Sequence, residues 1–238
     1  MIIKNKFGSE YWLRKIYTSK FFQFLTTNNS KLKKKVFTSI YKSNHWVQDE
    51  DILSNECLSV SGHGSNLNTN QFNELFKNFN KIIKKEKITS ILDMPCGDFL
   101  WLHEIIKNKN ITYHGVDIVS ELIERNKNKY KNKNFNFESC DILDFSTDKK
   151  FDLILIRDLF IHITNSDIKK IIQNVKKMDF KYILLNSYDN KTNNNVIVGQ
   201  HRKINLLIDP FEFGKPTYRF KDYENDKYFF LYDKKDFI

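Results

Sequence analysis

Hydrophobic and polar positions follow two alternating patterns along the chain. Short apolar runs of strand length end in polar residues, and segments with an apolar residue every three or four positions separate them. The predicted strands are 88–93, 111–117, 135–138, 151–156, 182–186 and 228–232. A predicted helix at 68–87 precedes them, and the helices 100–107, 120–130 and 165–178 lie between them. Strands that alternate with helices over short connections predict a parallel α/β sheet with right-handed crossovers.

The first sixty residues carry a helical pattern of their own. Apolar groups at three-and-four spacing over residues 10–42 predict two helices, broken at 26–30. The second helix carries Lys31 and Lys33 to Lys35, which we expect to form a solvated face. We therefore expect a helical N-terminal extension over residues 1–60 and a catalytic domain over 61–238. The extension could cover a site or form a dimer surface, so monomer and homodimer stay open.

Composition narrows the classes of partner. The 238 residues suffice for one α/β domain with its own core. The formal net charge is +10, but the lysines are scattered, so nucleic-acid binding is the less favoured interpretation. The three cysteines form no C-x-x-C pair, which predicts neither disulfides nor a metal site and favours a cytoplasmic protein. No segment reaches the roughly 20 apolar residues of a membrane span.

Residues 91–101, ILDMPCGDFLW, are the most informative stretch. A strand ends in Asp93, a turn with Pro95 and Gly97 follows, and a helix begins after it. In an open α/β sheet the ligand binds outside the carboxyl ends of the strands, which places Asp93 and the turn in a site. A side chain at Gly97 would hold a ligand away from the backbone.

A second acid, Asp117, ends the next predicted strand and suits two vicinal ribose hydroxyls. Dinucleotides and S-adenosylmethionine both carry such a ribose. A dinucleotide requires a G-x-G-x-x-G turn for its pyrophosphate, whereas Pro95 and Phe99 replace glycines here and Asp98 adds a repelling charge. S-adenosylmethionine has a sulfonium and an ammonium group and no phosphate, so the residues favour it over NAD.

Four motifs in this order resemble the class I S-adenosylmethionine-dependent methyltransferases. They are the stretch at 91–101, YHGVDI at 113–118, SCDI at 139–142 and FDLILIRD at 151–158. More narrowly, the chain resembles a bacterial subgroup with the motif D-x-P-C-G-D-F-x-W, often met among genes for surface polysaccharides. The resemblance covers roughly residues 46–238. It implies a Rossmann-like fold, with a mostly parallel seven-stranded sheet and an antiparallel C-terminal strand.

The resemblance also implies a set of cofactor contacts. SGHGS at 61–65 matches a subgroup segment that lies near the amino-acid end of the cofactor. Asp117 would bind the ribose, Asp141 and Ile142 the adenine, and Trp101 is interpreted as a core residue. The expected cofactor-binding residues are Gly62, Gly64, Ser65, Asp93, Pro95, Gly97, Asp98, Asp117, Ile118, Asp141, Ile142 and Arg157.

The acceptor should lie at the carboxyl end of the fourth strand. There Arg157, Asp158 and His162 match the subgroup pattern R-D-x-x-x-H. His162 titrates near neutrality and is the candidate general base, while Asp158 would orient it or act as the base itself.

A second subgroup pattern, W-R-x-L-N-L, is matched at Arg202 and Asn205, with His201 in place of the tryptophan. Arg202 would clamp an anionic group, or is a surface arginine.

These residues lead to one expected function and two alternatives. We expect a methyltransferase that uses S-adenosyl-L-methionine, without a metal, to O-methylate a small anionic acceptor. The resemblance suggests a sugar nucleotide or phosphorylated precursor in capsule or surface polysaccharide biosynthesis. An RNA or protein methyltransferase would use the lysines instead, and a non-catalytic binding module would keep only the cofactor site.

Overall fold

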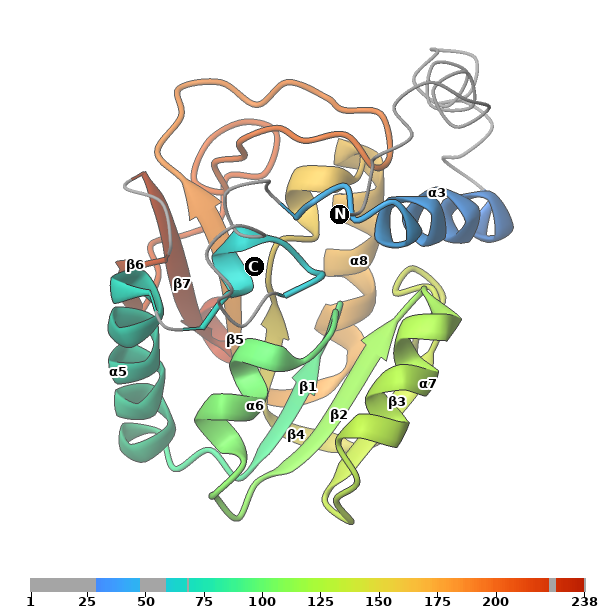
Figure 1. Ribbon diagram of the computed structural model, residues 1–238. Coiled ribbons are helices and arrows are strands. Elements are labelled where there is room, and N and C mark those ends of the chain that lie inside the picture. The colour runs from blue at the N-terminus through green and yellow to red at the C-terminus, as the bar shows by residue number, and fades with distance from the viewer. Residues whose placement is uncertain (1–28, 48–58, 68, 223–225, 238) are drawn as a thin grey trace.

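A seven-stranded sheet forms the centre of the molecule (Figure 1), which the computed structural model describes over residues 29–47, 59–67, 69–222 and 226–237. The strand order is β3-β2-β1-β4-β5-β7-β6. The strands are β1 (Ser90–Asp93), β2 (Thr112–Asp117), β3 (Phe135–Ser139), β4 (Lys150–Ile156), β5 (Asp179–Tyr188), β6 (Tyr218–Lys221) and β7 (Lys227–Asp233). β1 to β5 pair in parallel and β7 runs antiparallel to both its neighbours, which confirms the expected fold class.

Helices cover both faces of the sheet. The helices are α3 (Ser30–Lys42), α5 (Asn70–Lys85), α6 (Leu100–Ile106), α7 (Ser120–Lys129) and α8 (Asn165–Lys177). Alternate strand residues belong to two buried clusters: Leu92 packs with α3 and α8, whereas its neighbour Ile91 packs with α5 and α6. Because both faces are buried, the strands appear in the sequence as continuous apolar runs.

Two elements at the C-terminal side of the sheet differ from the prediction. β5 is longer than the expected 182–186, because its first residues pair with β4 and residues 182–188 pair with β7. The seventh strand implied by the resemblance is β6, whose position was not predicted, since its four residues alternate in burial and are ordered by pairing with β7. The helix expected before residue 26 lies outside the described residues.

Helix α3 lies across the edge of the sheet to which β1 and β2 point (Figure 1). Val36 and Phe37 join the same buried cluster as α8. Lys33 is 3% exposed, and its Nζ lies 3.0 Å from Oδ1 of the buried Asp167 in α8. The solvated face expected for the lysines of this helix is therefore wrong for Lys33, which stands one turn before Phe37 on the buried stripe.

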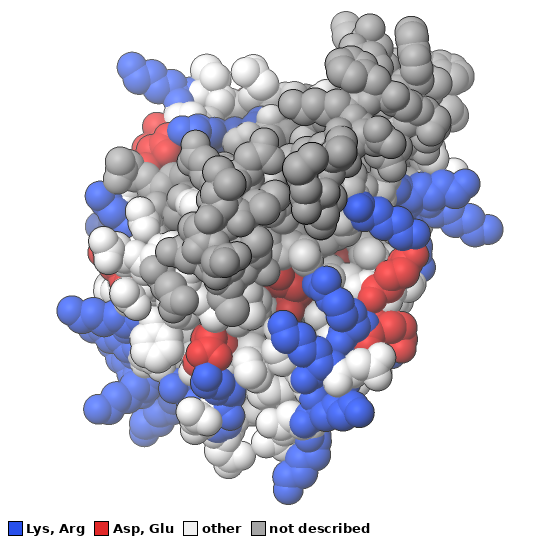
Figure 2. Space-filling view, in the orientation of Figure 1, with Lys and Arg blue, Asp and Glu red and all other residues white. Residues whose placement is uncertain are grey.

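Basic side chains are spread over the surface. Figure 2 shows Lys and Arg over several elements of the visible face, with acidic side chains between them rather than one continuous basic track. Among the helices of the described ranges, none combines the length and apolarity that crossing a bilayer requires.

Candidate active site

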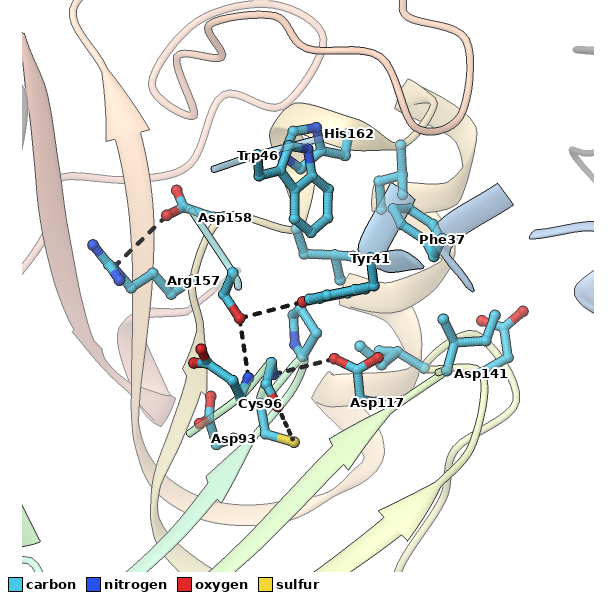
Figure 3. Close-up of a pocket in the computed structure, with 18 of the residues that line it drawn as sticks. Phe37, Tyr41, Trp46, Asp93, Cys96, Asp117, Asp141, Arg157, Asp158 and His162 are labelled. Carbon is cyan, nitrogen blue, oxygen red and sulfur yellow. Dashed lines mark hydrogen bonds and ion pairs between the residues drawn. The ribbon is translucent and has the colours of Figure 1, made fainter. Parts of the chain in front are cut away.

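A cavity opens at the carboxyl ends of β1, β2 and β4 and holds about 960 Å³ of empty space, including solvent at its mouth. It brings together most of the site residues expected from the sequence (Figure 3). These are Ser65, Asp93, Pro95, Gly97, Asp98, Asp117, Ile118, Asp141, Ile142, Arg157, Asp158 and His162. Gly62, Gly64, His201, Arg202 and Asn205 lie outside the lining of the cavity.

The turn at Gly97 forms the floor of the cavity. Gly97 has a φ of +53°, and a Cβ added there would lie 2.4 Å from Oγ of Ser61. Its N–H donates to Asp117 Oδ2 at 3.1 Å, and its carbonyl accepts from Asn126 at 2.7 Å. Glycine is thus favoured by the backbone conformation and by the close approach of Ser61.

Asp117 ends β2 beside this turn. Its second oxygen, Oδ1, accepts from the N–H of Val119 at 3.0 Å. Burial raises the pKa of the carboxyl to about 6, although its backbone hydrogen bonds lower it. An acceptor-only side chain fixed at this place can bind hydroxyl groups in the cavity.

Asp93 ends β1 and is more strongly perturbed. Burial, with the charge of Asp117, raises the pKa of its carboxyl to about 8. The hydroxyl of Tyr113 donates to Asp93 Oδ2 at 2.8 Å. A Cβ at Gly115 would lie 2.7 Å from that hydroxyl, so this glycine leaves room for the bond. Asp93 is therefore mostly protonated at neutral pH, and a nearby cation would favour its ionised form.

Asp98 has a different role from the other acids of the cavity. Its Oδ2 accepts from the Ser59 hydroxyl at 2.8 Å and from the N–H of Val60 at 2.9 Å, and its Oδ1 accepts from the N–H of Leu100 at 3.2 Å. The carboxylate of Asp98 therefore holds residues 59–61 against the turn at Gly97.

Apolar groups surround Asp141 at the opposite end of the cavity. Asp141 follows β3, and its Oδ1 accepts from the N–H of Leu143 at 3.0 Å. Ile118, Ile142 and Leu143 line the cavity here. In Figure 3, Phe37 of α3 lies on the side of Asp141. The combination of a carboxylate and apolar cover suits a flat ring with an exocyclic amine.

Three buried charges and the half-buried Asp158 form a network beside the cavity. Arg157 Nη2 lies 3.1 Å from Asp222 Oδ1, and Lys227 Nζ lies 3.2 Å from Asp222 Oδ2 and 2.6 Å from Asp158 Oδ1. Arg157 also donates to the hydroxyl of Ser65 at 3.0 Å and to the carbonyl of Gly64 at 2.7 Å. The arginine therefore anchors the 61–65 loop to β4.

His162 is held as a neutral imidazole. Its Nδ1 lies 3.0 Å from the carbonyl oxygen of Gln200, which can only accept, so Nδ1 carries the proton and Nε2 the lone pair. Burial lowers the pKa of His162 to about 4. The expectation that Asp158 orients this ring is replaced by the contact with Gln200.

Asp158 forms ion pairs with two basic side chains, Lys227 and Arg157, instead. Although burial opposes ionisation, Lys227 and Arg157 lower the pKa of Asp158 to about 2. It also has a φ of +58°, and its N–H donates to Asn186 Oδ1 at 2.9 Å. A carboxylate with so low a pKa is a weak base.

The residues expected to bind the acceptor are used within the protein. Arg202 donates to the carbonyl of Ile163 and to the side chain of Asn165, each at 2.7 Å. The amide of Asn205 donates to the carbonyl of Asn190 at 2.9 Å. Both residues thus brace the segment after β5. His201 is exposed, and its ring centroid lies 5.8 Å from that of His162.

The sequence allowed the N-terminal extension to cover the site as one of two roles, but it did not identify the residues that line the cavity. Lys33, Phe37 and Tyr41 of α3 stand at i, i+4 and i+8 and line it, followed by Trp46. Tyr41 and Ser61 approach each other at 3.4 Å between their hydroxyl oxygens. The apolar stripe of residues 32–41 was visible in the sequence, but nothing in it indicated which surface the stripe covers.

Comparison with known proteins adds a family match. Residues 91–178, from β1 to the end of α8, match a family model described as a methyltransferase domain. A search of curated proteins found no match.

Solved structures share the fold. The N-methyltransferase NodS from Bradyrhizobium japonicum WM9 in complex with S-adenosyl-L-homocysteine is 15% identical over 70% of this chain and 89% of its own, with a TM-score of 0.52. The PH0226 protein from Pyrococcus horikoshii OT3 is 15% identical over 70% of this chain and 92% of its own, with a TM-score of 0.53. A weaker match, PKMT2 from Rickettsia typhi in complex with AdoHcy, is 21% identical over 43% of this chain and 22% of its own, and its TM-score of 0.39 is too low to indicate a shared fold.

Proposed function

We propose that the protein is a methyltransferase that binds S-adenosyl-L-methionine in this cavity. The observation that carries the proposal is the pair of buried acids, Asp93 and Asp117, at the tips of adjacent parallel strands on either side of the Gly97 turn. The family match over 91–178 includes both acids and the turn. A dinucleotide is disfavoured, because the carboxylate of Asp98 lines the floor of the cavity, where it would repel a pyrophosphate.

The cofactor fits the donors and acceptors of the cavity. Asp117 would accept from the ribose hydroxyls, Asp93 would face the methionyl ammonium, and Asp141 with Ile142 would surround the adenine. When bound, S-adenosyl-L-methionine supplies the methyl group on its sulfonium. The role of this chain is to orient an acceptor in line with that methyl group and to hold the proton that the acceptor loses.

His162 is the proposed general base. Its Nε2 lone pair can accept a hydrogen bond from an acceptor hydroxyl, because the Gln200 carbonyl holds the proton on Nδ1. A neutral ring needs no prior deprotonation at pH 7. A pKa of about 4 makes the imidazole a weak base, but a stronger one than Asp158 with its pKa of about 2. Asp158 is proposed to keep Lys227 and Arg157 in place beside the acceptor rather than to take the proton.

For the acceptor we propose a hydroxyl group on a small molecule. A sugar nucleotide or phosphorylated precursor of a capsule or surface polysaccharide remains the candidate from the D-x-P-C-G-D-F-x-W resemblance alone. The charges of the cavity do not favour an anion at the reacting end, because the lysine and the arginine that line it in the described part of the chain are already paired: Lys33 with Asp167, and Arg157 with Asp222. We therefore expect any phosphate of the acceptor to remain outside the cavity.

Calorimetry with S-adenosyl-L-homocysteine tests the proposal directly. The wild-type protein should bind it, and His162→Ala should bind it equally well, because the imidazole lies at the acceptor end. With radiolabelled S-adenosyl-L-methionine and a cell metabolite extract, methyl transfer should fall at least about 100-fold in His162→Ala. Absence of binding heat for the wild type with both the cofactor and its demethylated product would overturn the proposal.

Cofactor binding should also release a proton at pH 7. Asp93, with its pKa raised to about 8, is mostly protonated in the free protein, and a bound cation favours the ionised form. We expect release of up to about one proton, declining above pH 9 where Asp93 is already ionised. Calorimetry in phosphate and in Tris, which differ in ionisation heat, measures this number. Asp93→Asn should remove the release, and equal heats in both buffers for the wild type would contradict the assignment.

A further inference from the structure

The rings of Trp46 and His162 stack at the acceptor end of the cavity. Their centroids lie 4.9 Å apart, with 24° between the planes (Figure 3). Trp46 follows α3 and lies well before the matched domain at 91–178. We infer that Trp46 is a positioning residue, which holds the His162 imidazole neutral and fixes the direction of its Nε2 toward the acceptor. This inference rests on the proposed function, in which His162 is the base.

The indole of Trp46 is itself held in place. Tyr41 meets it edge-on with ring centroids 5.0 Å apart, and Phe37 lies at 6.5 Å. A Cβ at Gly62, which has a φ of +109°, would lie 3.4 Å from Trp46 Cβ. That distance is an ordinary contact, so the φ of Gly62 rather than the space beside Trp46 favours glycine here, which gives this residue a role other than cofactor contact.

Two contacts determine the orientation of the imidazole. The Gln200 carbonyl accepts from Nδ1 in the plane of the ring, and the indole covers one face. The backbone around the ring is also fixed, because the N–H of Gly199 donates to the carbonyl of His162 at 2.8 Å. A rotation of the ring would break the hydrogen bond or the stack. Together the two contacts fix the direction in which Nε2 points.

Trp46 affects the protonation of His162 in two opposite ways. The indole excludes water from the ring, which disfavours the charged imidazolium. Its negative face also attracts a cation, which favours the imidazolium. Complete burial shifts a pKa by up to about 3–5 units, whereas a cation–π contact is worth about 0.5–2 kcal/mol, or roughly 1.5 units at most. His162 is 9% exposed, so exclusion of water prevails. The charged groups around the ring are Asp158, which favours the imidazolium, and His201 and Lys227, which oppose it.

The experiment is a pH titration by NMR of protein labelled with ¹⁵N-histidine. The His162 signals are assigned by their loss in His162→Gln, and their shifts report both the pKa and the tautomer. We expect wild-type His162 to titrate well below about 6.5 with the proton on Nδ1. Trp46→Ala should raise its pKa by at least about one unit and mix the tautomers, because water reaches the ring. Trp46→Phe, which restores a flat apolar face, should recover most of the wild-type behaviour.

Measuring the stability and the cofactor affinity of each variant distinguishes a specific change at His162 from a general loss of folding. A folded Trp46→Ala protein that binds S-adenosyl-L-homocysteine like the wild type, but leaves the His162 pKa and tautomer unchanged, would overturn the inference. A wild-type His162 that titrates near 6.5 would do the same. If Trp46→Ala does not fold, Trp46→Leu keeps apolar bulk without a flat ring and should still mix the tautomers. Failure of the wild type to bind the cofactor would remove the proposed function while the titration still reports on the stack.

Discussion

Replacing Asp117 with alanine should lower the affinity for S-adenosyl-L-homocysteine by at least about 100-fold. A hydrogen bond to a charged group contributes about 1.5–3 kcal/mol, and the ribose offers two hydroxyls to this carboxylate. The loss of both bonds is therefore about 3–6 kcal/mol, which corresponds to roughly two to four powers of ten in affinity. Calorimetric titration of wild type and variant measures the change.

Two further variants separate ribose binding from support of the turn. Asp117 also accepts from the N–H of Gly97, so its removal affects the cavity floor as well. Asp117→Asn keeps one oxygen acceptor without the charge and should give an intermediate affinity. Asp148→Ala removes an exposed acid outside the cavity and should leave binding unchanged. Superimposable titrations of wild type and Asp117→Ala would refute the ribose assignment.

Replacing Lys33 with methionine should have the largest effect on stability. Lys33 and Asp167 are 3% and 0% exposed, and their charged groups lie 3.0 Å apart. Removal of the ammonium leaves the Asp167 carboxylate buried without its counter-charge, which typically costs about 3–5 kcal/mol. Urea unfolding measures this loss, and the affinity for S-adenosyl-L-homocysteine should fall as well, because α3 lines the cavity.

A matched substitution on the same helix provides the control. Lys31 is exposed, so Lys31→Met should change the free energy of unfolding by less than about 0.5 kcal/mol. The double variant Lys33→Met with Asp167→Leu leaves neither charge buried and should recover much of the stability. If Lys33→Met were no more destabilising than Lys31→Met, the ion pair would have no structural importance.

The sheet and the floor of the cavity were predictable because their signals are local. Strands such as β4 are apolar at successive positions, since each face of the sheet meets a helix layer. Asp93 and Asp117 are the last residues of β1 and β2, and parallel strands bring their carboxyl ends to one edge. The glycine at 97 was recognised for a close approach, although the group that approaches it in the structure is Ser61.

The cover of the cavity and the roles of the later loop were not predictable in the same way. Lys33 looked like a member of an exposed lysine run, because its partner Asp167 lies on another helix. Arg202 and Asn205 matched a motif, but their hydrogen-bond partners depend on the conformation of an irregular segment without periodicity. Asp158 and His162 are neighbours in sequence, yet Lys227 and Gln200 determine their states.

The ion pair between α3 and α8 also affects the order in which parts of the protein can fold during synthesis. Lys33 and Asp167 are separated by 134 positions, so the helix that is synthesised early has to wait for a late one. Contacts of such long range form slowly, because a large loop must close first. Until then the apolar stripe of the nascent α3 lacks its native partner, which is the condition under which chaperones bind emerging chains.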